Sequence, residues 1–413
     1  MGNNDVLREL AKQYAEIANS DQNHLNIILH RKVNDLKPSR PALLIDEIPW
    51  QEMNIENELT LVSDDPVLQT VEQYMRQTIY KWNHMRADMV VPPYIGVQKI
   101  IHSTGIGITP KHDGAYHETH GDVQNVQYVN QLNTEEDLEK LHNEIITWDE
   151  TETRKRFEQI AETIGDIIPV KITGEPTGYL LGCKTWDDIC TYRGVNTLFY
   201  DLIDRPEFMH ALVGKLTNIF LDKIRQYEEL NLFDGDSYAL QGTAALTNDL
   251  HPEQDHVKAN QVWGRGLAQI LASVSPSMHE EFDIDYMKKA MAPFGLVYYG
   301  CCEPLHNKID ILRQIPHLRK ISISPWANID IAAEAVSGDY VIAAKASPSK
   351  LAVTNLDESS IRDELRHIIN ACRHNNCNFD IALKDITTVC GRPQNLFRWE
   401  QIASEVVREF DWM

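Results

Sequence analysis

The fold is decided by the stretch between residues 295 and 346, where three short hydrophobic runs are separated by helix-like segments. The runs read GLVYYGCC (295–302), LRKISIS (318–324) and DYVIAAKA (339–346). Short runs of this kind, bounded by turn residues and alternating with amphipathic segments, predict buried strands of a parallel sheet. We therefore expect an α/β protein.

The same alternation extends from about residue 42 to the C-terminal end. The eight candidate strands are ALLID (42–46), MVVPPYI (89–95), IPVKITG (168–174), SYALQ (237–241), GLVYYGCC (295–302), LRKISIS (318–324), DYVIAAKA (339–346) and FDIALKDI (379–386). Eight strands with intervening helices predict a (β/α)8 TIM barrel. An open doubly wound sheet is the alternative, but no G-x-G-x-x-G or P-loop follows an early strand to support its nucleotide-binding form.

Two segments do not fit a minimal barrel. Residues 1–40 have a helical pattern and are expected to form an N-terminal helical extension, with the barrel over 41–413. The connection between the second and third strands, residues 97–165, is far longer than a standard connection. We expect it to be an insertion that caps the pocket.

Composition excludes several classes of function. The chain has 39 Lys and Arg against 61 Asp and Glu, a net charge of −22. This balance argues against nucleic-acid binding, and against a polyanionic substrate unless a local basic pocket exists. No apolar run reaches the roughly 18–20 residues of a membrane span, and the polar start MGNNDVLREL lacks the core of a signal peptide. We expect a cytoplasmic protein whose seven cysteines are free thiols or metal ligands.

In a barrel, the chemistry lies at the carboxyl ends of the strands. Reading those ends gives the candidate residues Asp46, Glu47, Gln241, Tyr299, Cys301, Cys302, Glu303, Ser324, Trp326, Lys345 and Cys390. Polar residues also occur at strand ends for structural reasons, so the cysteines are the informative members. Because Cys301 and Cys302 are adjacent, only one of them is expected to face the barrel centre.

Cys301 and Cys390 follow strands whose ends both open onto the barrel mouth, where their thiolates could hold zinc. The alternative is that each is a small buried hydrophobe, which is the more frequent role of a free cysteine. We assign that structural role to the cysteines away from strand ends, which are Cys183, Cys190, Cys372 and Cys377.

Four segments resemble the uroporphyrinogen decarboxylase-like superfamily. They are LKPSRPALLIDEIPWQEM (36–53), GLVYYGCCEPLHNKIDILRQIP (295–316), LRKISISPWANID (318–330) and VCGRPQNLFRW (389–399). The similarity is to the corrinoid- and zinc-dependent methyltransferase branch, and in particular to uncharacterised members with the YGCCEPL signature. It implies a zinc site at Cys301 and Cys390, and a methyl group that travels to a thiol or to a corrinoid on a separate partner protein.

The chain departs from the pattern of that branch at one position. Tyr299 stands where the family has a histidine, which leaves one zinc ligand missing. Glu303 is the favoured replacement, because it lies on the same face as Cys301 if the strand continues, and His251 is the alternative. Either residue also has a simpler role, Glu303 as a helix cap and His251 as a solvated loop residue. With the ligand replaced, the Tyr299 phenol is expected to face the pocket.

The remaining candidates are weaker. Trp263, Trp326 and Tyr299 are expected to line an apolar pocket for a methylated substrate, together with Gln241, Ser324 and His251. The YHETH stretch (116–120) has two histidines three residues apart, but its neighbouring glycines favour a loop over a metal-binding helix. One of Asp46 and Glu47 should face the pocket and bind a cation or accept a proton.

The sequence therefore predicts a methyltransferase acting on a small methylated substrate, with zinc as a cofactor. Its catalytic residues are Tyr299, Glu303, Asp46, Glu47 and Lys345. A true uroporphyrinogen decarboxylase is excluded, because the arginine-rich opening motif of that enzyme is absent and IDEIPW (45–50) places two acids there. Two alternatives stay open: a metal-free decarboxylase or lyase in which Lys345 and Asp46 or Glu47 handle protons, and a non-catalytic small-molecule binding protein.

Overall fold

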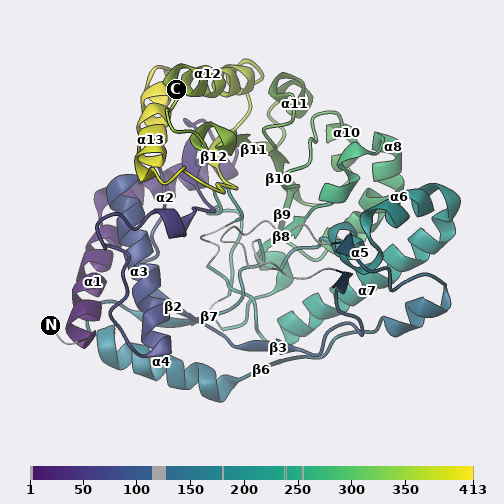
Figure 1. Ribbon diagram of the computed structural model, residues 1–413, viewed down its shortest axis with the longest axis horizontal. Coiled ribbons are helices and arrows are strands. Elements are labelled where there is room, and N and C mark those ends of the chain that lie inside the picture. Colours follow the sequence, from purple (N-terminus) through teal and green to yellow (C-terminus); the bar gives the residue numbers. More distant parts are fainter. Residues whose placement is uncertain are drawn as a thin grey trace.

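The structure is a computed structural model that describes residues 3–113, 127–178, 181–236, 238, 240–253 and 255–412. In Figure 1 the strands lie in the centre, and helices surround them on most sides. The largest sheet has six parallel strands in the order β1-β12-β11-β10-β9-β8. This sheet positions the candidate site.

The strands of this sheet are β1 (Ala42–Ile45), β8 (Trp263–Gly266), β9 (Leu296–Tyr299), β10 (Leu318–Ile323), β11 (Val341–Ala346) and β12 (Phe379–Leu383). A separate parallel pair is β2 (Ile95–Gln98) with β7 (Val170–Thr173). Two antiparallel pairs are β3 (Ile101–Ser103) with β6 (Ile146–Trp148), and β4 (His112–Asp113) with β5 (Gln127–Tyr128). The α/β class and the parallel central sheet are therefore confirmed.

The α-helices are α1 (Asn3–Ala18), α2 (Asp21–Asn34), α3 (Pro66–His84), α4 (Glu150–Ile164), α5 (Thr185–Arg193), α6 (Val195–Asp204), α7 (Pro206–Glu229), α8 (Pro276–His279), α9 (Asp285–Met291), α10 (Ile309–Leu312), α11 (Ile329–Val336), α12 (Glu358–His374) and α13 (Pro393–Arg408). Short 3₁₀ turns are η1 (Trp50–Glu52), η2 (Glu136–Lys140), η3 (Ala259–Gln261), η4 (Gln269–Ser273) and η6 (Pro348–Leu351), and η5 (Glu280–Ile284) is a π turn. Several helices begin at side-chain caps, which accept backbone N–H groups that the first turn leaves unpaired. The capping residues of α2, α3, α4 and α12 are Ser20, Asp65, Asp149 and Asp357.

Helices α1, α3 and α4 form a hydrophobic cluster at the N-terminal side of the molecule, the purple and blue region of Figure 1. Leu7 and Tyr14 of α1 are buried there against Met75 of α3 and Ile160 of α4. The largest core lies between the sheet and the helices that cover it, and it includes Ile321 of β10. None of the described helices is long and apolar enough to cross a membrane.

Two strands differ from the sequence-based expectation for identifiable reasons. The second strand was predicted at 89–95 but begins at Ile95, after Pro92 and Pro93, because proline has no N–H to donate to a ladder. Strand β8 (WGRG) was not predicted, because its two glycines have little β propensity. In the predicted fourth strand (237–241), Leu240 makes only an isolated bridge, and residues 237 and 239 lie outside the described residues.

The predicted closed barrel is not shown, because the six-stranded sheet ends at β1 and at β8. Between β8 and the β2–β7 pair, the described residues form isolated parallel bridges, Cys183 with Gly266 and Glu175 with Phe233. This order of neighbours is compatible with a barrel whose hydrogen-bonded ladder is interrupted. The structure therefore supports a central parallel sheet without establishing closure.

Beside β1, the backbone and the side chain of Asp88 make hydrogen bonds of the kind that a neighbouring strand would make. The Asp88 backbone N–H donates to the Leu43 carbonyl at 2.9 Å, and the Asp88 carboxylate accepts the Leu43 N–H at 2.8 Å. The same carboxylate accepts two hydrogen bonds of 2.7 Å from the Arg40 guanidinium. Asp88 is 4% exposed, so its charge depends on these partners.

We expect Asp88→Ala to lower the free energy of unfolding by about 2–4 kcal/mol, because it leaves the Leu43 N–H unpaired and removes the carboxylate partner of Arg40. Urea unfolding followed by circular dichroism measures the change. Asp166→Ala is the matched control, because Asp166 pairs with Arg8 at an exposed position and its loss should change little. Equal stability of the two variants would contradict the role of Asp88.

Candidate functional site

The inner face of the six-stranded sheet carries charged and aromatic side chains. Because side chains alternate between the faces of a strand, residues two apart share a face. The Tyr298 ring on β9 lies 5.6 Å from the Arg265 guanidinium and 5.9 Å from the Lys345 Nζ, measured to the ring centroid. Arg265 of β8, Tyr298 of β9 and Lys345 of β11 therefore face the same interior space.

A buried ion pair forms the floor of this space. The Lys320 Nζ lies 2.9 Å from the Asp380 Oδ2, and both side chains are 0% exposed. The Thr243 hydroxyl donates to the same Asp380 oxygen at 2.6 Å, and Lys320 also donates to the Ala244 carbonyl at 2.7 Å. Burial lowers the pKa of Lys320 to about 8, against the opposing effect of Asp380.

Lys345 lies on the same face as this pair and has no carboxylate in contact among the described residues. Its Nζ donates to the Gly242 carbonyl. Burial lowers the pKa of Lys345 to about 8, although Asp380 opposes the shift. The predicted catalytic Lys345 is therefore an interior amine whose charge is only partly compensated.

Beyond the strand ends, Cys301 contacts a second interior lysine. The Cys301 side chain is buried, and its Sγ lies 3.8 Å from the Lys384 Nζ. A hydrogen bond with the Cys302 thiol, at 3.5 Å between the sulfurs, and the Lys384 cation lower the pKa of Cys301 to about 7. Burial alone would raise it. A substantial fraction of Cys301 is therefore thiolate near neutral pH, the reactive form of cysteine.

Two acids complete the surroundings of Lys384. Its Nζ lies 3.3 Å from the Glu47 Oε2 and 3.1 Å from the Asp385 Oδ2. Burial, followed by a hydrogen bond with Asp385, raises the pKa of Glu47. The pKa of Asp385 is lowered by Glu47 and Lys384, although burial opposes the shift. Two adjacent carboxyl groups rarely ionise together, and the opposite pKa shifts make Glu47 the group that more readily keeps a proton and Asp385 the group that more readily ionises.

The backbone at these two acids is strained. Glu47 has a φ of 50° and Asp385 a φ of 56°, in the left-handed region that non-glycine residues seldom adopt. Such conformations persist where surrounding contacts enforce them, often at functional sites. Here the Asp385 N–H donates to the Glu47 carboxylate at 3.1 Å, which holds the two loops together.

Asp46 and Gln241, both predicted site residues, orient this group. The Gln241 amide donates to the Glu47 Oε1 at 2.7 Å. The Asp46 carboxylate accepts the N–H of Gly242 at 2.9 Å and that of Glu47 at 2.9 Å. Of the two predicted acids, Glu47 is thus the one that contacts Lys384, while Asp46 anchors the loop.

Glu303 does not lie free to bind a metal ion. It is 2% exposed, and its carboxylate accepts the backbone N–H of Cys301 at 2.8 Å and of Ala268 at 3.3 Å. Burial raises the pKa of Glu303, against the effect of these bonds. Its role here is to hold the turn that presents Cys301, and it caps no helix, because the next helix, α10, begins only at Ile309.

Tyr299 lies on the opposite face of β9 from Tyr298, which corrects the expectation that its phenol faces the pocket. Its hydroxyl donates to the Asp283 carboxylate at 2.6 Å and lies 2.7 Å from the His279 Nε2. Tyr299 therefore joins β9 to the helical layer, and alternation places Tyr298 in the interior instead.

The predicted zinc ligands are not brought together. Cys390 is exposed, at a φ of 55°, and His251 is exposed in a loop, whereas Cys301 is buried beside a lysine. Among the described residues, no group of three or more His, Cys, Asp or Glu side chains could hold a metal ion. The thiolate charge of Cys301 is compensated by Lys384, so these residues do not fit a zinc site. The YHETH residues His117 and His120 lie outside the described residues.

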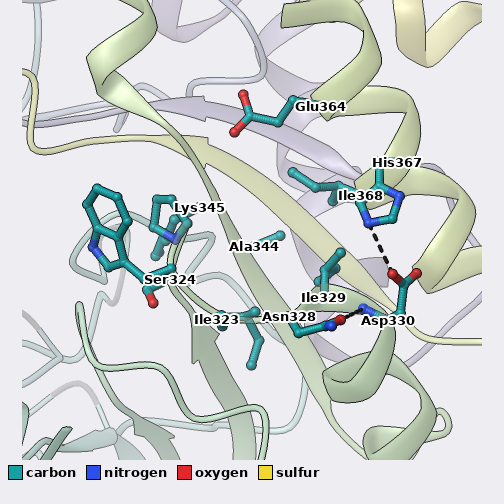
Figure 2. Close-up of a pocket in the computed structure, with 13 residues that line it drawn as sticks. Ile323, Ser324, Asn328, Ile329, Asp330, Ala344, Lys345, Glu364, His367 and Ile368 are labelled. Atoms are coloured by element: carbon teal, nitrogen blue, oxygen red, sulfur yellow. Dashed lines mark hydrogen bonds and ion pairs between the residues drawn. The ribbon is translucent and has the colours of Figure 1, made fainter. Parts of the chain in front are cut away.

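Three further predicted residues share one cavity of about 380 Å³. Ser324, Trp326 and Lys345 contribute to its wall, together with residues of α11 and α12. Figure 2 shows Ser324 and Lys345 at one end and His367 with Asp330 at the other. Trp326 is 69% exposed at this cavity. Trp263, by contrast, is fully buried, and its indole N–H donates to the Ala245 carbonyl at 2.9 Å, so it packs beneath the site.

The sequence analysis missed the cations and one acid that surround Cys301, namely Arg265, Lys384 and Asp385. A signal was present in the strand FDIALKDI (379–386), where Lys384 interrupts an otherwise buried run. A charge on a buried strand requires a partner, which marks it as a candidate. Arg265 had no such signal, because β8 itself was not predicted.

Comparisons with known proteins do not assign a family. No protein-family model matches the chain, and no curated protein matches it. A solved structure, a methyltransferase from Methanosarcina mazei, is similar with a TM-score of 0.48 and 10% sequence identity. The match covers 93% of this chain and 98% of that one. At this level of similarity, the solved structure supports no inference about function, and the function is inferred from the geometry of the site.

We expect Lys384→Met to raise the pKa of Cys301 above its value of about 7. Because only the thiolate reacts, alkylation of Cys301 by iodoacetamide at pH 7 should slow about tenfold, and its pH midpoint should move upward. Mass spectrometry of the peptide, with fragmentation to separate Cys301 from Cys302, gives the rate at each pH.

Lys350→Met is the matched control, because Lys350 pairs with Glu364 outside this group. It should leave the pH midpoint unchanged. A midpoint that is the same in Lys384→Met and in the unmodified protein would show that Lys384 does not stabilise the thiolate.

Proposed function

We propose that the protein is a methyltransferase that moves a methyl group from a small methylated substrate to an acceptor thiol. The observation that carries this proposal is the contact of the Lys384 Nζ with both the buried Cys301 sulfur and the carboxyl group of Glu47, whose pKa is raised by burial. Transfer of a methyl group to a thiol needs a base for the acceptor and an acid for the leaving group. This arrangement supplies both within contact of one lysine.

The Cys301 thiolate would act as the base. A substrate thiol has an ordinary pKa near 8.5, so transfer of its proton to a thiolate with a pKa of about 7 is only modestly uphill. The substrate thiolate then attacks the methyl carbon in line with the bond that breaks. Lys384 compensates the negative charge before and after this proton transfer.

The carboxyl group of Glu47 would act as the acid. When the methyl carbon leaves its oxygen or nitrogen atom, the bonding electron pair stays on that atom, which takes the Glu47 proton. The proton on Cys301 then returns to Glu47. A path exists, because the Cys301 and Cys302 sulfurs are 3.5 Å apart, the Cys302 Sγ lies 3.4 Å from the Asp385 carboxylate, and Asp385 is hydrogen-bonded to Glu47.

Zinc and a corrinoid, both predicted from the sequence, take no part in this mechanism. No step passes through zinc, because the described residues do not present a donor set for it. A corrinoid on a partner protein is the alternative acceptor, and it would not need Cys301 as a base. The effect of Cys301→Ser on transfer to each acceptor therefore distinguishes the two.

A metal-free decarboxylase or lyase is the second candidate, and the interior amine of Lys345 favours it. With a pKa of about 8, part of this amine is neutral near neutral pH and could handle a proton together with Glu47. The third possibility, a small-molecule binding protein without catalysis, would retain the site and give no product.

The test uses 2-mercaptoethanol as acceptor and a panel of ¹³C-methyl donors: methanol, methylamines, methoxybenzenes and the trimethylsulfonium ion. We expect a labelled methyl thioether, detected by mass spectrometry, and a loss of about 10²–10⁴-fold in rate in Cys301→Ser. Glu47→Gln should slow transfer from oxygen and nitrogen donors but not from trimethylsulfonium, whose leaving group needs no proton.

Lys350→Met again serves as the control and should retain the full rate. An unchanged rate in Cys301→Ser would reject the base, and equal losses with all donors in Glu47→Gln would reject the acid. Release of carbon dioxide from a carboxylic acid, without methyl transfer, would favour the lyase.

A further inference from the structure

The interior face contains a guanidinium group that pairs with no carboxylate among the described residues. Arg265 is 3% exposed, and its Nε has no hydrogen-bond partner in the part of the chain that the structure describes. The guanidinium lies over the Tyr298 ring, 5.6 Å from its centroid. Buried charges are normally paired, because their removal from water is costly. An arginine left in this state indicates that its partner is a ligand.

The other interior cations show why Arg265 is exceptional. Lys320 is matched by Asp380, and Lys384 by Asp385 and the Cys301 thiolate. Among the described residues, neither Arg265 nor Lys345 has a carboxylate within ion-pair distance. Among the acceptors that the structure describes, the Lys345 Nζ donates to the Gly242 carbonyl alone, so two of its N–H groups could donate to another acceptor.

A second unpartnered polar group lies at the end of β10. The Ser324 hydroxyl is buried, with the residue 3% exposed, and it has no hydrogen-bond partner. Ser324 and Lys345 line the same cavity and lie at the same end of it in Figure 2. The Ser324 hydroxyl and the Lys345 amine are both donors, so this cavity is suited to an acceptor with negative charge. Arg265 does not line the cavity, but it contacts the same Tyr298 ring that the Lys345 amine faces.

We propose that Arg265 and Lys345 bind a carboxylate group of the substrate, and this inference rests on the proposed function. The planar guanidinium matches the two oxygens of a carboxylate, and the Lys345 amine adds a second donor. The substrate class is thus a small methylated carboxylic acid. Its negative charge would supply the partner that Arg265 lacks.

The strand register sets the direction of binding. Arg265 and Lys345 are each the penultimate residue of a parallel strand, whereas Cys301, Lys384 and Glu47 follow the ends of their strands. The carboxylate site therefore lies deeper than the thiolate. A substrate that enters with its carboxylate first leaves its other end, with the methyl group, beside Cys301 and Glu47.

The test compares alkylation of Cys301 by iodoacetate, which carries a carboxylate, and by iodoacetamide, its neutral analogue. In each reaction the Cys301 sulfur forms a bond to the CH2 carbon, and iodide leaves with the electron pair. We expect the ratio of the iodoacetate rate to the iodoacetamide rate to exceed that of free cysteine by about tenfold, because the cations concentrate the anion.

Arg265→Gln should return this ratio toward that of free cysteine. The iodoacetamide rate should also fall, because Arg265 contributes to lowering the pKa of Cys301, so the ratio of the two rates carries the test. Arg265→Lys, which keeps the charge, should retain part of the excess. If both rates fall equally in Arg265→Gln, the residue supports the thiolate alone and the carboxylate site is overturned. If iodoacetamide fails to alkylate Cys301 below pH 8, the proposed thiolate base is wrong, whatever the ratio.

A direct measurement separates the two proposals further. In Cys301→Ser, which has no thiolate, propionate should still raise the melting temperature, and propionamide should not. Arg265→Gln in the same background should abolish the rise. A larger rise with inorganic phosphate than with propionate, or no rise with propionate, would overturn the carboxylate class.

Discussion

A single buried ion pair fixes the floor of the site. Lys320 on β10 and Asp380 on β12 are separated by β11, and both are fully buried. Either charge alone would cost several kcal/mol in this interior, so each is stable because the other is present. Thr243 and Ala244 bond to the same pair and tie the preceding loop to it. The positions of Gly242 and Lys345 above depend on this arrangement.

The same requirement for charge balance explains the arrangement of the acidic groups around Lys384. Lys384 is surrounded by three acidic groups, the Cys301 thiol and the carboxyl groups of Glu47 and Asp385. A single cation does not compensate three anions in a buried site, so one group keeps its proton. Burial and the neighbouring Asp385 raise the pKa of Glu47, which makes it the carboxyl group that most readily keeps its proton. Electrostatics thus favours a thiolate and a protonated acid beside one lysine.

The elements that the sequence predicted well are the strands with an uninterrupted hydrophobic run. Strands β1 and β9–β12 were predicted within a few residues, since their runs are continuous and apolar. Strand β8 was not predicted because its glycines have little β propensity. Arg265 lies on this strand and was therefore not predicted either. The cysteines marked the right strand end, but spacing alone did not show that Lys384, and not a second thiolate, faces Cys301. That contact depends on which face of β12 points inward.

The net charge of the chain reflects the charges on its surface and does not predict the charges of its interior. A charge of −22 excludes a basic outer face, yet three lysines and an arginine lie buried on the inner face of the sheet. The outer acids are screened by solvent and salt within about 10 Å, whereas the interior cations act across a medium of low dielectric constant. The sign of the field at the site is therefore set by the few buried groups. A chain that is strongly acidic by composition can in this way present a cationic binding site.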